Sequence, residues 1–163
     1  MEAKRGIGTP VQTLLAAHSI APANASAQHA PLPLEQFLRI GTHIARALAE
    51  FHARNGVHGH LSPANIVFFP GGNAEIKGAP ATSSAATTVE HWIYQAPEQT
   101  GRFERPVDAR SDLYVLGVVL YELLVGALPF KATDALSWIH SHVAKSPRPP
   151  IVALPAIPQT VSD

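Results

Sequence analysis

Apolar residues recur at every third or fourth position from Leu34 to Phe51, which is the spacing of an amphipathic helix. The members of this series are Leu34, Phe37, Leu38, Gly41, Ile44, Ala45, Leu48 and Phe51. The Asn55-Gly56 pair that follows offers a left-handed backbone stop. We therefore predict a helix that begins at Leu34 and ends near residue 55.

Two short apolar runs come next, at 66–69 and 74–76. They flank the segment Pro70-Gly71-Gly72-Asn73, whose residue types favour a tight turn. This arrangement predicts a small β-hairpin. Residues 78–90, "GAPATSSAATTVE", show neither helical nor strand periodicity and are predicted to form a loop.

The segment "SDLYVLGVVLYELLVG" is predicted to be a helix that Ser111 or Asp112 caps and that Gly126 ends. It is apolar on nearly every face, and such a helix normally lies at the centre of a core. A second helix is predicted from Asp134 to Ala144. The Pro-rich tail after it cannot continue that helix.

Residues 1–33 are rich in Ala, Pro, Ser and Asn and are predicted to be an irregular linker. Their only apolar patch is weak, so we predict no secretory signal. The longest apolar run, 113–120, is far shorter than the roughly 20 residues that span a bilayer. These observations predict a cytoplasmic protein with no membrane insertion.

The amino-acid composition further narrows the class of protein and its possible partners. With 46% hydrophobic residues the 163-residue chain can build a core. Lys+Arg and Asp+Glu balance at 12 each, which argues against nucleic acid as a partner. The absence of cysteine excludes a disulfide framework and cysteine-based zinc sites.

Three motifs then point to one family. "HGHLSPAN" (58–65) resembles the protein-kinase catalytic loop, whose pattern is H-R-D-L-K-P-x-N. "YQAPEQ" (94–99) resembles the Ala-Pro-Glu segment that closes the activation loop, and "DARSDLYVLGVVLYELLVGALPF" (108–130) resembles the buried helix of the large lobe. Together with "DALSWIHSHVAKSPRPP", they resemble the serine/threonine-kinase-like domain of large hybrid sensor proteins. In those proteins the domain precedes an AAA-type ATPase, a GAF domain and a histidine kinase.

This resemblance covers roughly residues 34–163 and implies a protein kinase-like α+β fold. We expect the large C-terminal lobe only, mainly α-helical, with a short catalytic-loop β-hairpin and a truncated C-terminal end. Residues 1–33 contain no G-x-G-x-x-G and no strand lysine, so no N-terminal lobe is recognisable.

The resemblance also assigns positions. His58 stands at the family's histidine, His60 replaces the catalytic aspartate, and Asn65 keeps the magnesium-binding asparagine. The Asp-Phe-Gly motif falls on residues 78–80, which read Gly-Ala-Pro, and no Asp or Glu lies between residues 77 and 88. No carboxylate is therefore available there to hold magnesium.

The other matched positions imply structural roles. Asp112 is expected to accept hydrogen bonds from the loop backbone, and Asn65 to cap that loop through its amide. Glu98 normally pairs with an arginine, so we expect it to use solvent or one of three nearby arginines. The matched structural residues are His58, Pro97, Glu98, Asp112 and Gly117; the arginines are Arg102, Arg105 and Arg110.

The nine histidines raise the question of a metal site. His58 and His60 are two residues apart, as are His140 and His142, and such pairs chelate on a strand but diverge on a helix. Because cysteine is absent and no carboxylate stands at ligand spacing, we predict no metal site.

Three functions remain open. The first is a catalytically impaired, pseudokinase-like regulatory module of a signal-transduction sensor kinase, needing no cofactor and acting on downstream ATPase or histidine kinase modules or other signalling proteins. The second is an active serine/threonine kinase that uses ATP and magnesium, with His60 as base, since imidazole can take up a proton near neutral pH. The third is a truncated gene product without independent function.

Overall fold

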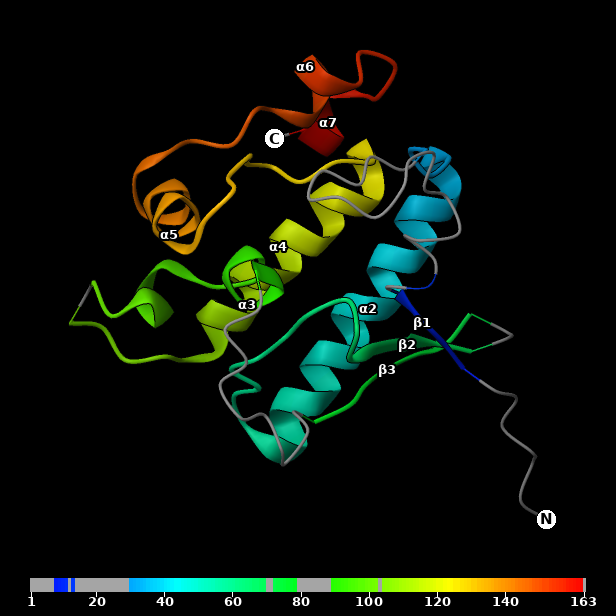
Figure 1. Cartoon of the computed structure of the whole chain (residues 1–163). Helices are drawn as coiled ribbons and strands as arrows, with labels where there is room; N and C mark the ends of the chain where they lie inside the picture. The colour runs from blue at the N-terminus through cyan, green and yellow to red at the C-terminus, as the bar shows by residue number, and fades with distance from the viewer. Residues whose placement is uncertain are drawn as a thin grey trace.

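The computed structural model describes residues 8–11, 13, 30–69, 72–78, 89–102 and 104–162. In chain order the elements are β1 (Thr9–Pro10), α2 (Leu34–Asn55), β2 (Ile66–Phe68), β3 (Ala74–Ile76), α3 (Val89–Ile93), the 3-10 helix η1 (Pro97–Thr100), α4 (Ala109–Val125), α5 (Ala135–Ala144), α6 (Pro150–Ala153) and α7 (Gln159–Ser162). Figure 1 shows the small sheet lying against α2, while α4 runs from the level of α3 toward α6 and α7.

The predicted first helix is confirmed as α2, which begins at Leu34 and ends at Asn55. Gly56 has φ 75 and ψ −147, so its φ is positive as expected but its ψ lies outside the left-handed helical region. Leu38, predicted in the apolar series, is 47% exposed. The buried face consists of Phe37, Ile40, Ile44, Ala47 and Leu48.

The predicted hairpin is also confirmed, as the antiparallel pair β2 and β3. Pro70 and Gly71 of its turn lie outside the described residues. The prediction of an irregular segment at 1–33 is wrong for Thr9–Pro10, which form β1 and pair with β2. Val11 follows directly and is fully buried. A two-residue strand carries too little periodicity for sequence patterns to detect it.

The predicted buried helix exists as α4, but its N-cap is Asp108 rather than Ser111 or Asp112. The Asp108 carboxylate accepts a hydrogen bond from the Arg110 N–H at 2.7 Å. Ser111 is the third helical residue, and its hydroxyl accepts from the Asp108 N–H at 3.3 Å, which completes a capping box. Gly126 ends the helix in the left-handed region, with φ 80 and ψ 11, as predicted.

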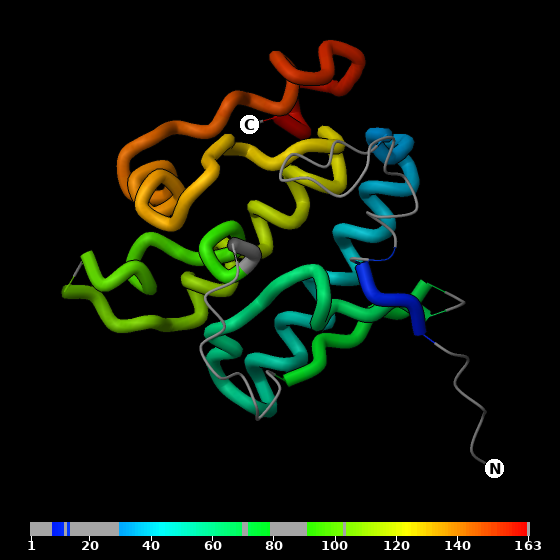
Figure 2. The backbone as a smooth tube through the Cα atoms, viewed as in Figure 1, coloured from blue at the N-terminus to red at the C-terminus, as the bar shows by residue number. Residues whose placement is uncertain are grey.

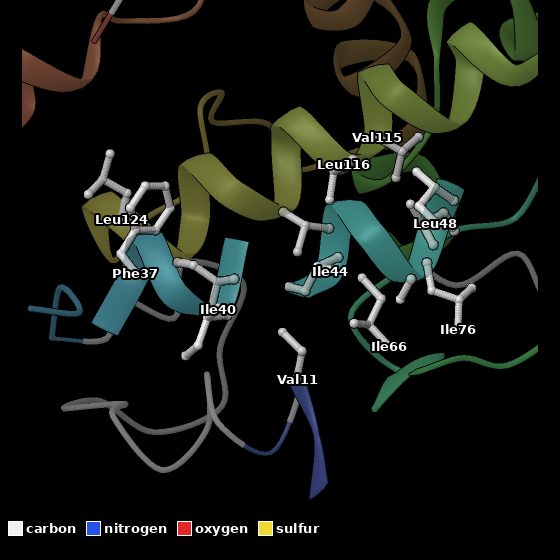
Figure 3. Packing of buried hydrophobic residues seen from close by; sticks show 14 of the residues in the cluster. Val11, Phe37, Ile40, Ile44, Leu48, Ile66, Ile76, Val115, Leu116 and Leu124 are labelled. Carbon is white, nitrogen blue, oxygen red and sulfur yellow. The ribbon is translucent and has the colours of Figure 1, made fainter. Parts of the chain in front are cut away.

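Helices α2 and α4 and the sheet share one apolar core. Figure 3 shows Val11 reaching into this cluster from the end of β1. Ile66 and Ile76 enter it from the hairpin. The α4 members are Val115, Leu116, Val119, Leu123 and Leu124.

The remaining helices cover the other side of α4. The helix predicted from Asp134 to Ala144 is confirmed as α5 (Ala135–Ala144), and Asp134 is its N-cap rather than its first helical residue. Val89 and Glu90, predicted in a loop, belong to α3, while residues 79–88 lie outside the described part. The Pro-rich tail forms the short helices α6 and α7, and α6 contacts α4. Within the described ranges, no helix has the length and apolar character that crossing a bilayer requires.

Gly117 is an exposed glycine within α4, and a Cβ atom built there would meet no heavy atom within 4 Å outside the local helix. Gly117→Ala should therefore stabilise the fold by about 0.5–1 kcal/mol, because alanine restricts the unfolded backbone. Urea unfolding measures this difference.

Gly41→Ala in α2 is the matched control, since its Cβ would lie 3.3 Å from the Leu120 side chain. We expect a smaller gain there, or a loss. A loss of stability in Gly117→Ala would contradict the open environment described for that position.

Candidate functional site

The candidate site is built around Asp112, which is 1% exposed in the first turn of α4. Its Oδ2 accepts a hydrogen bond from the His58 N–H at 2.8 Å, and its Oδ1 accepts one from the Gly59 N–H at 2.8 Å. These are the bonds that the kinase resemblance implies for this position. Because a charged acceptor makes strong hydrogen bonds, Asp112 fixes the start of the loop that leads to His60.

His52, near the end of α2, completes the surroundings of Asp112. Its Nε2 lies 2.7 Å from Asp112 Oδ2, and its side chain is 19% exposed. This contact joins α2 to α4 directly behind the loop. No local sequence pattern points to His52, because 60 residues separate it from Asp112.

His58 is buried and links the loop to the hairpin. Its Nδ1 accepts a hydrogen bond from the His60 N–H at 3.2 Å, and its Nε2 lies 2.8 Å from the Lys77 carbonyl oxygen. A backbone N–H can only donate and a carbonyl can only accept, so the ring is neutral with its proton on Nε2. The His58 ring also packs against Phe51, with centroids 5.0 Å apart.

Asn65 holds the second half of the loop. Its Nδ2 donates to the His60 carbonyl at 2.8 Å, and its Oδ1 accepts from the Ser62 N–H at 2.9 Å. These two bonds are those expected of a side-chain cap.

The peptide groups on both sides of the His60 Cα are therefore held, the N–H by His58 and the carbonyl by Asn65. The imidazole itself is exposed and makes no hydrogen bond to any residue that the structure describes.

The segment around Pro97 and Glu98 forms η1, with Pro97 as its first residue. We expected Glu98 to use solvent or one of Arg102, Arg105 and Arg110. Its Oε1 instead accepts a hydrogen bond from the Ser111 hydroxyl, and no ion pair joins Glu98 to these arginines among the described residues. Ser111 sits in the first turn of α4, so this bond joins η1 to the helix that carries Asp112.

Gln99 is a second contact that the sequence analysis missed. Its Nε2 donates to the Gly59 carbonyl, and its Oε1 accepts from the Ala96 N–H at 2.9 Å. The side chain thus ties η1 to the His60 loop. Its place next to the matched Ala-Pro-Glu residues was the only available signal.

His142 lies apart from the loop, inside an aromatic cage. The Tyr114 hydroxyl lies 2.9 Å from its Nδ1, and the Trp92 carbonyl lies 3.0 Å from its Nε2. Since the carbonyl can only accept, Nε2 carries the proton and Tyr114 donates. The ring stacks on Trp138 with centroids 5.9 Å apart. Burial lowers the pKa of His142, and burial together with the nearby Glu98 charge raises the pKa of Tyr114 to about 12.

No three histidine, aspartate or glutamate side chains come close enough to hold a metal ion in the described part of the chain. His140 is exposed and His142 is buried, so this pair diverges on α5 as predicted. Of the positions that the resemblance assigns to magnesium, Asn65 is described with both ends of its amide engaged in the loop.

Comparisons with known proteins bear directly on this arrangement. No family model matches the chain. It is 48% identical over 80 residues to a hybrid signal transduction histidine kinase G of Dictyostelium discoideum, an alignment covering 49% of this chain and 2% of that protein. It is 35% identical over 144 residues to the DNA damage-responsive serine/threonine-protein kinase RqkA of Deinococcus radiodurans, covering 83% of this chain and 21% of the kinase.

A third relative is the serine/threonine-protein kinase pkn3 of Myxococcus xanthus, 32% identical over 136 residues, with 74% of this chain and 24% of the kinase aligned. Over most of its length the chain is therefore homologous to bacterial serine/threonine protein kinases. It spans about a fifth to a quarter of these two kinases. Its helices and small sheet are compatible with a protein kinase-like fold.

Asp112→Ala should destabilise the fold by about 2–5 kcal/mol, because it leaves the buried His58 N–H and the partly buried Gly59 N–H without an acceptor. Asp112→Asn should also destabilise, since its amide NH₂ would face one of these donors. Chemical denaturation measures both. Asp134→Asn changes an exposed cap and should cost far less; equal losses at the two positions would contradict the role given to Asp112.

Acid should weaken the fold through His142. Its folded pKa lies below the ordinary 6.5, so the unfolded chain takes up the proton first as the pH falls. The contribution of His142 is complete above about pH 6.5 and is lost below it. Thermal unfolding at a series of pH values from about 8 down to about 5 measures how steeply the stability falls with pH.

His142→Gln should flatten this pH dependence, whereas His140→Gln, an exposed change two residues away, should leave it as in the wild type. Identical slopes in the wild type and His142→Gln would show that other groups set the acid sensitivity.

Proposed function

We propose that this chain forms the large-lobe part of a protein kinase-like domain that has lost phosphoryl transfer and acts as a regulatory or interaction module. The homology to bacterial serine/threonine kinases supports the domain class. The mainly helical architecture, with its small antiparallel sheet beside the loop at 58–65, supports the large lobe.

The observation that carries the proposal is that this loop keeps the residues that hold its shape but lacks the family's charged catalytic residue. The groups that hold its shape, Asp112, His58 and Asn65, are present and bonded. At the position that faces the substrate in the family, His60 presents an exposed imidazole in place of a carboxylate. Phosphoryl transfer depends on charge placed around the phosphates and metal, and the loop retains none of its acidic groups.

ATP and magnesium are not required by this proposal. The described residues do not fit a magnesium site, because they bring no cluster of metal-binding side chains together. The family's Asp-Phe-Gly motif, whose aspartate binds magnesium, is matched by Gly78, Ala79 and Pro80. None of these residues has a side chain that can ligate a cation.

The relative in Dictyostelium discoideum, a hybrid signal transduction histidine kinase, supports a signalling context. We propose that a domain of this kind acts on ATPase or histidine kinase modules, or on other signalling proteins. It would do so by binding rather than by phosphorylating them.

An active kinase is the second candidate, and one observation favours it. The His60 imidazole is exposed and unbonded within the described structure, so it is accessible to a substrate hydroxyl as a base.

A transfer assay with labelled ATP, magnesium and a general protein substrate separates the two candidates. We expect no incorporation above background in the wild type, and none in a His60→Asp variant, because restoring one carboxylate does not restore the metal ligands. A thermal shift measured with magnesium and ATP should likewise be absent.

His60→Ala is the decisive control. Label that the wild type incorporates and His60→Ala does not would establish the active-kinase reading and overturn the proposal. A nucleotide-dependent thermal shift that disappears in Asn65→Ala would also count against it, by showing that the loop still binds a metal-nucleotide complex.

A further inference from the structure

Strand β3 lies at the edge of the sheet, since the strand order is β1-β2-β3. Two hydrogen bonds fix which of its backbone groups face β2: Phe69 N–H to the Asn73 carbonyl at 2.9 Å, and Lys77 N–H to the Asn65 carbonyl at 2.9 Å. In an antiparallel ladder the direction alternates, so residues 73, 75 and 77 face inward. The backbone groups of Ala74, Ile76 and Gly78 therefore face outward, away from β2.

An open groove runs along this outer edge. It has a volume of about 1060 Å³ and is lined by every residue from 73 to 78, by α2 and by Phe69, but by no residue of β2 itself. Its apolar lining includes Ala47, Phe51 and Ile76. An additional strand can lie in this space and use the outward backbone groups. In Figure 2 the hairpin can be followed from the end of α2, with β3 returning alongside the helix.

The charged side chains of β3 indicate which strand could pair with this edge. Glu75 and Lys77 are both exposed and stand two residues apart, so they share one face of the strand, opposite the buried Ile76. A second copy of this strand, antiparallel about a two-fold axis through Ile76, places Glu75 opposite the Lys77 of the copy and Lys77 opposite its Glu75. Directly opposite charges of unlike sign stabilise a strand pair.

The two neighbouring registers of this strand pair are electrostatically unfavourable. An axis through Glu75 or through Lys77 also matches the outward backbone groups, but it sets two like charges against each other, which destabilises the pair. The sequence "AEIKG" at 74–78 is therefore complementary to itself in one register.

We infer that two copies of this chain associate through their β3 edges, forming a continuous antiparallel sheet with Ile76 on the two-fold axis. The interface combines outward backbone hydrogen bonds at 74, 76 and 78 with two symmetric Glu75–Lys77 pairs. It does not depend on whether the loop at 58–65 is catalytic, so it stands apart from the function proposed above.

Charge-reversal variants of the full chain test this interface by sedimentation equilibrium at low ionic strength, across a broad range of protein concentrations. We expect the wild type to form a dimer. Glu75→Lys and Lys77→Glu should each weaken the dimer by about tenfold or more, because each sets like charges opposite one another. The double variant exchanges the two charges and should recover the wild-type affinity.

Lys131→Glu is the matched control, since it makes the same charge change on an exposed residue in the connection between α4 and α5 and should leave the dimer unchanged. Far-UV circular dichroism verifies folding of each variant. A monomeric wild type would overturn the inference. A dimer that ignores both single changes, or a folded double variant that stays weak, would also overturn it, and would leave the groove to a peptide of another protein.

Discussion

The structure depends on one buried carboxylate. Asp112 belongs to the most buried helix, yet its oxygens accept hydrogen bonds from the backbone of a loop more than fifty residues away in the chain. Burying a carboxylate is unfavourable unless donors surround it, and here two backbone N–H groups and His52 do so. The loop in turn needs the carboxylate, because the His58 and Gly59 N–H groups have no other acceptor among the described residues. Helix, loop and hairpin are thus fixed together.

Shape and chemistry are separable in this loop. Asp112, His58 and Asn65 bond to backbone atoms, so their work is independent of which side chain stands at position 60. The residues that would carry charge in the family are histidine and small uncharged residues here. A fold can therefore remain while a reaction is lost, which is why homology to kinases alone does not establish kinase activity.

Sequence patterns predicted the parts of the fold that are locally encoded. The helical periodicity of 34–51, the turn at 70–73 and the helix predicted at 134–144 each lie within a short window, and the structure has the corresponding α2, hairpin and α5. The resemblance to kinases supplied the positions of Asp112, His58 and Asn65. What both missed depends on tertiary contact: β1 exists only because β2 offers an edge, and Glu98 meets Ser111 because η1 packs on α4. His52 and the His142 cage are contacts of the same kind.

The held backbone and free ring of His60 have an evolutionary consequence. The exposed side chain makes no hydrogen bond in the described structure, and the bonds at this position belong to the backbone, so mutations there are close to neutral for folding. Such a position drifts readily once selection for catalysis is relaxed, and it can equally be recruited for a new purpose without compensating changes elsewhere. The identity of residue 60 in related chains is therefore a record of selection on chemistry, while residues 58, 65 and 112 record selection on architecture.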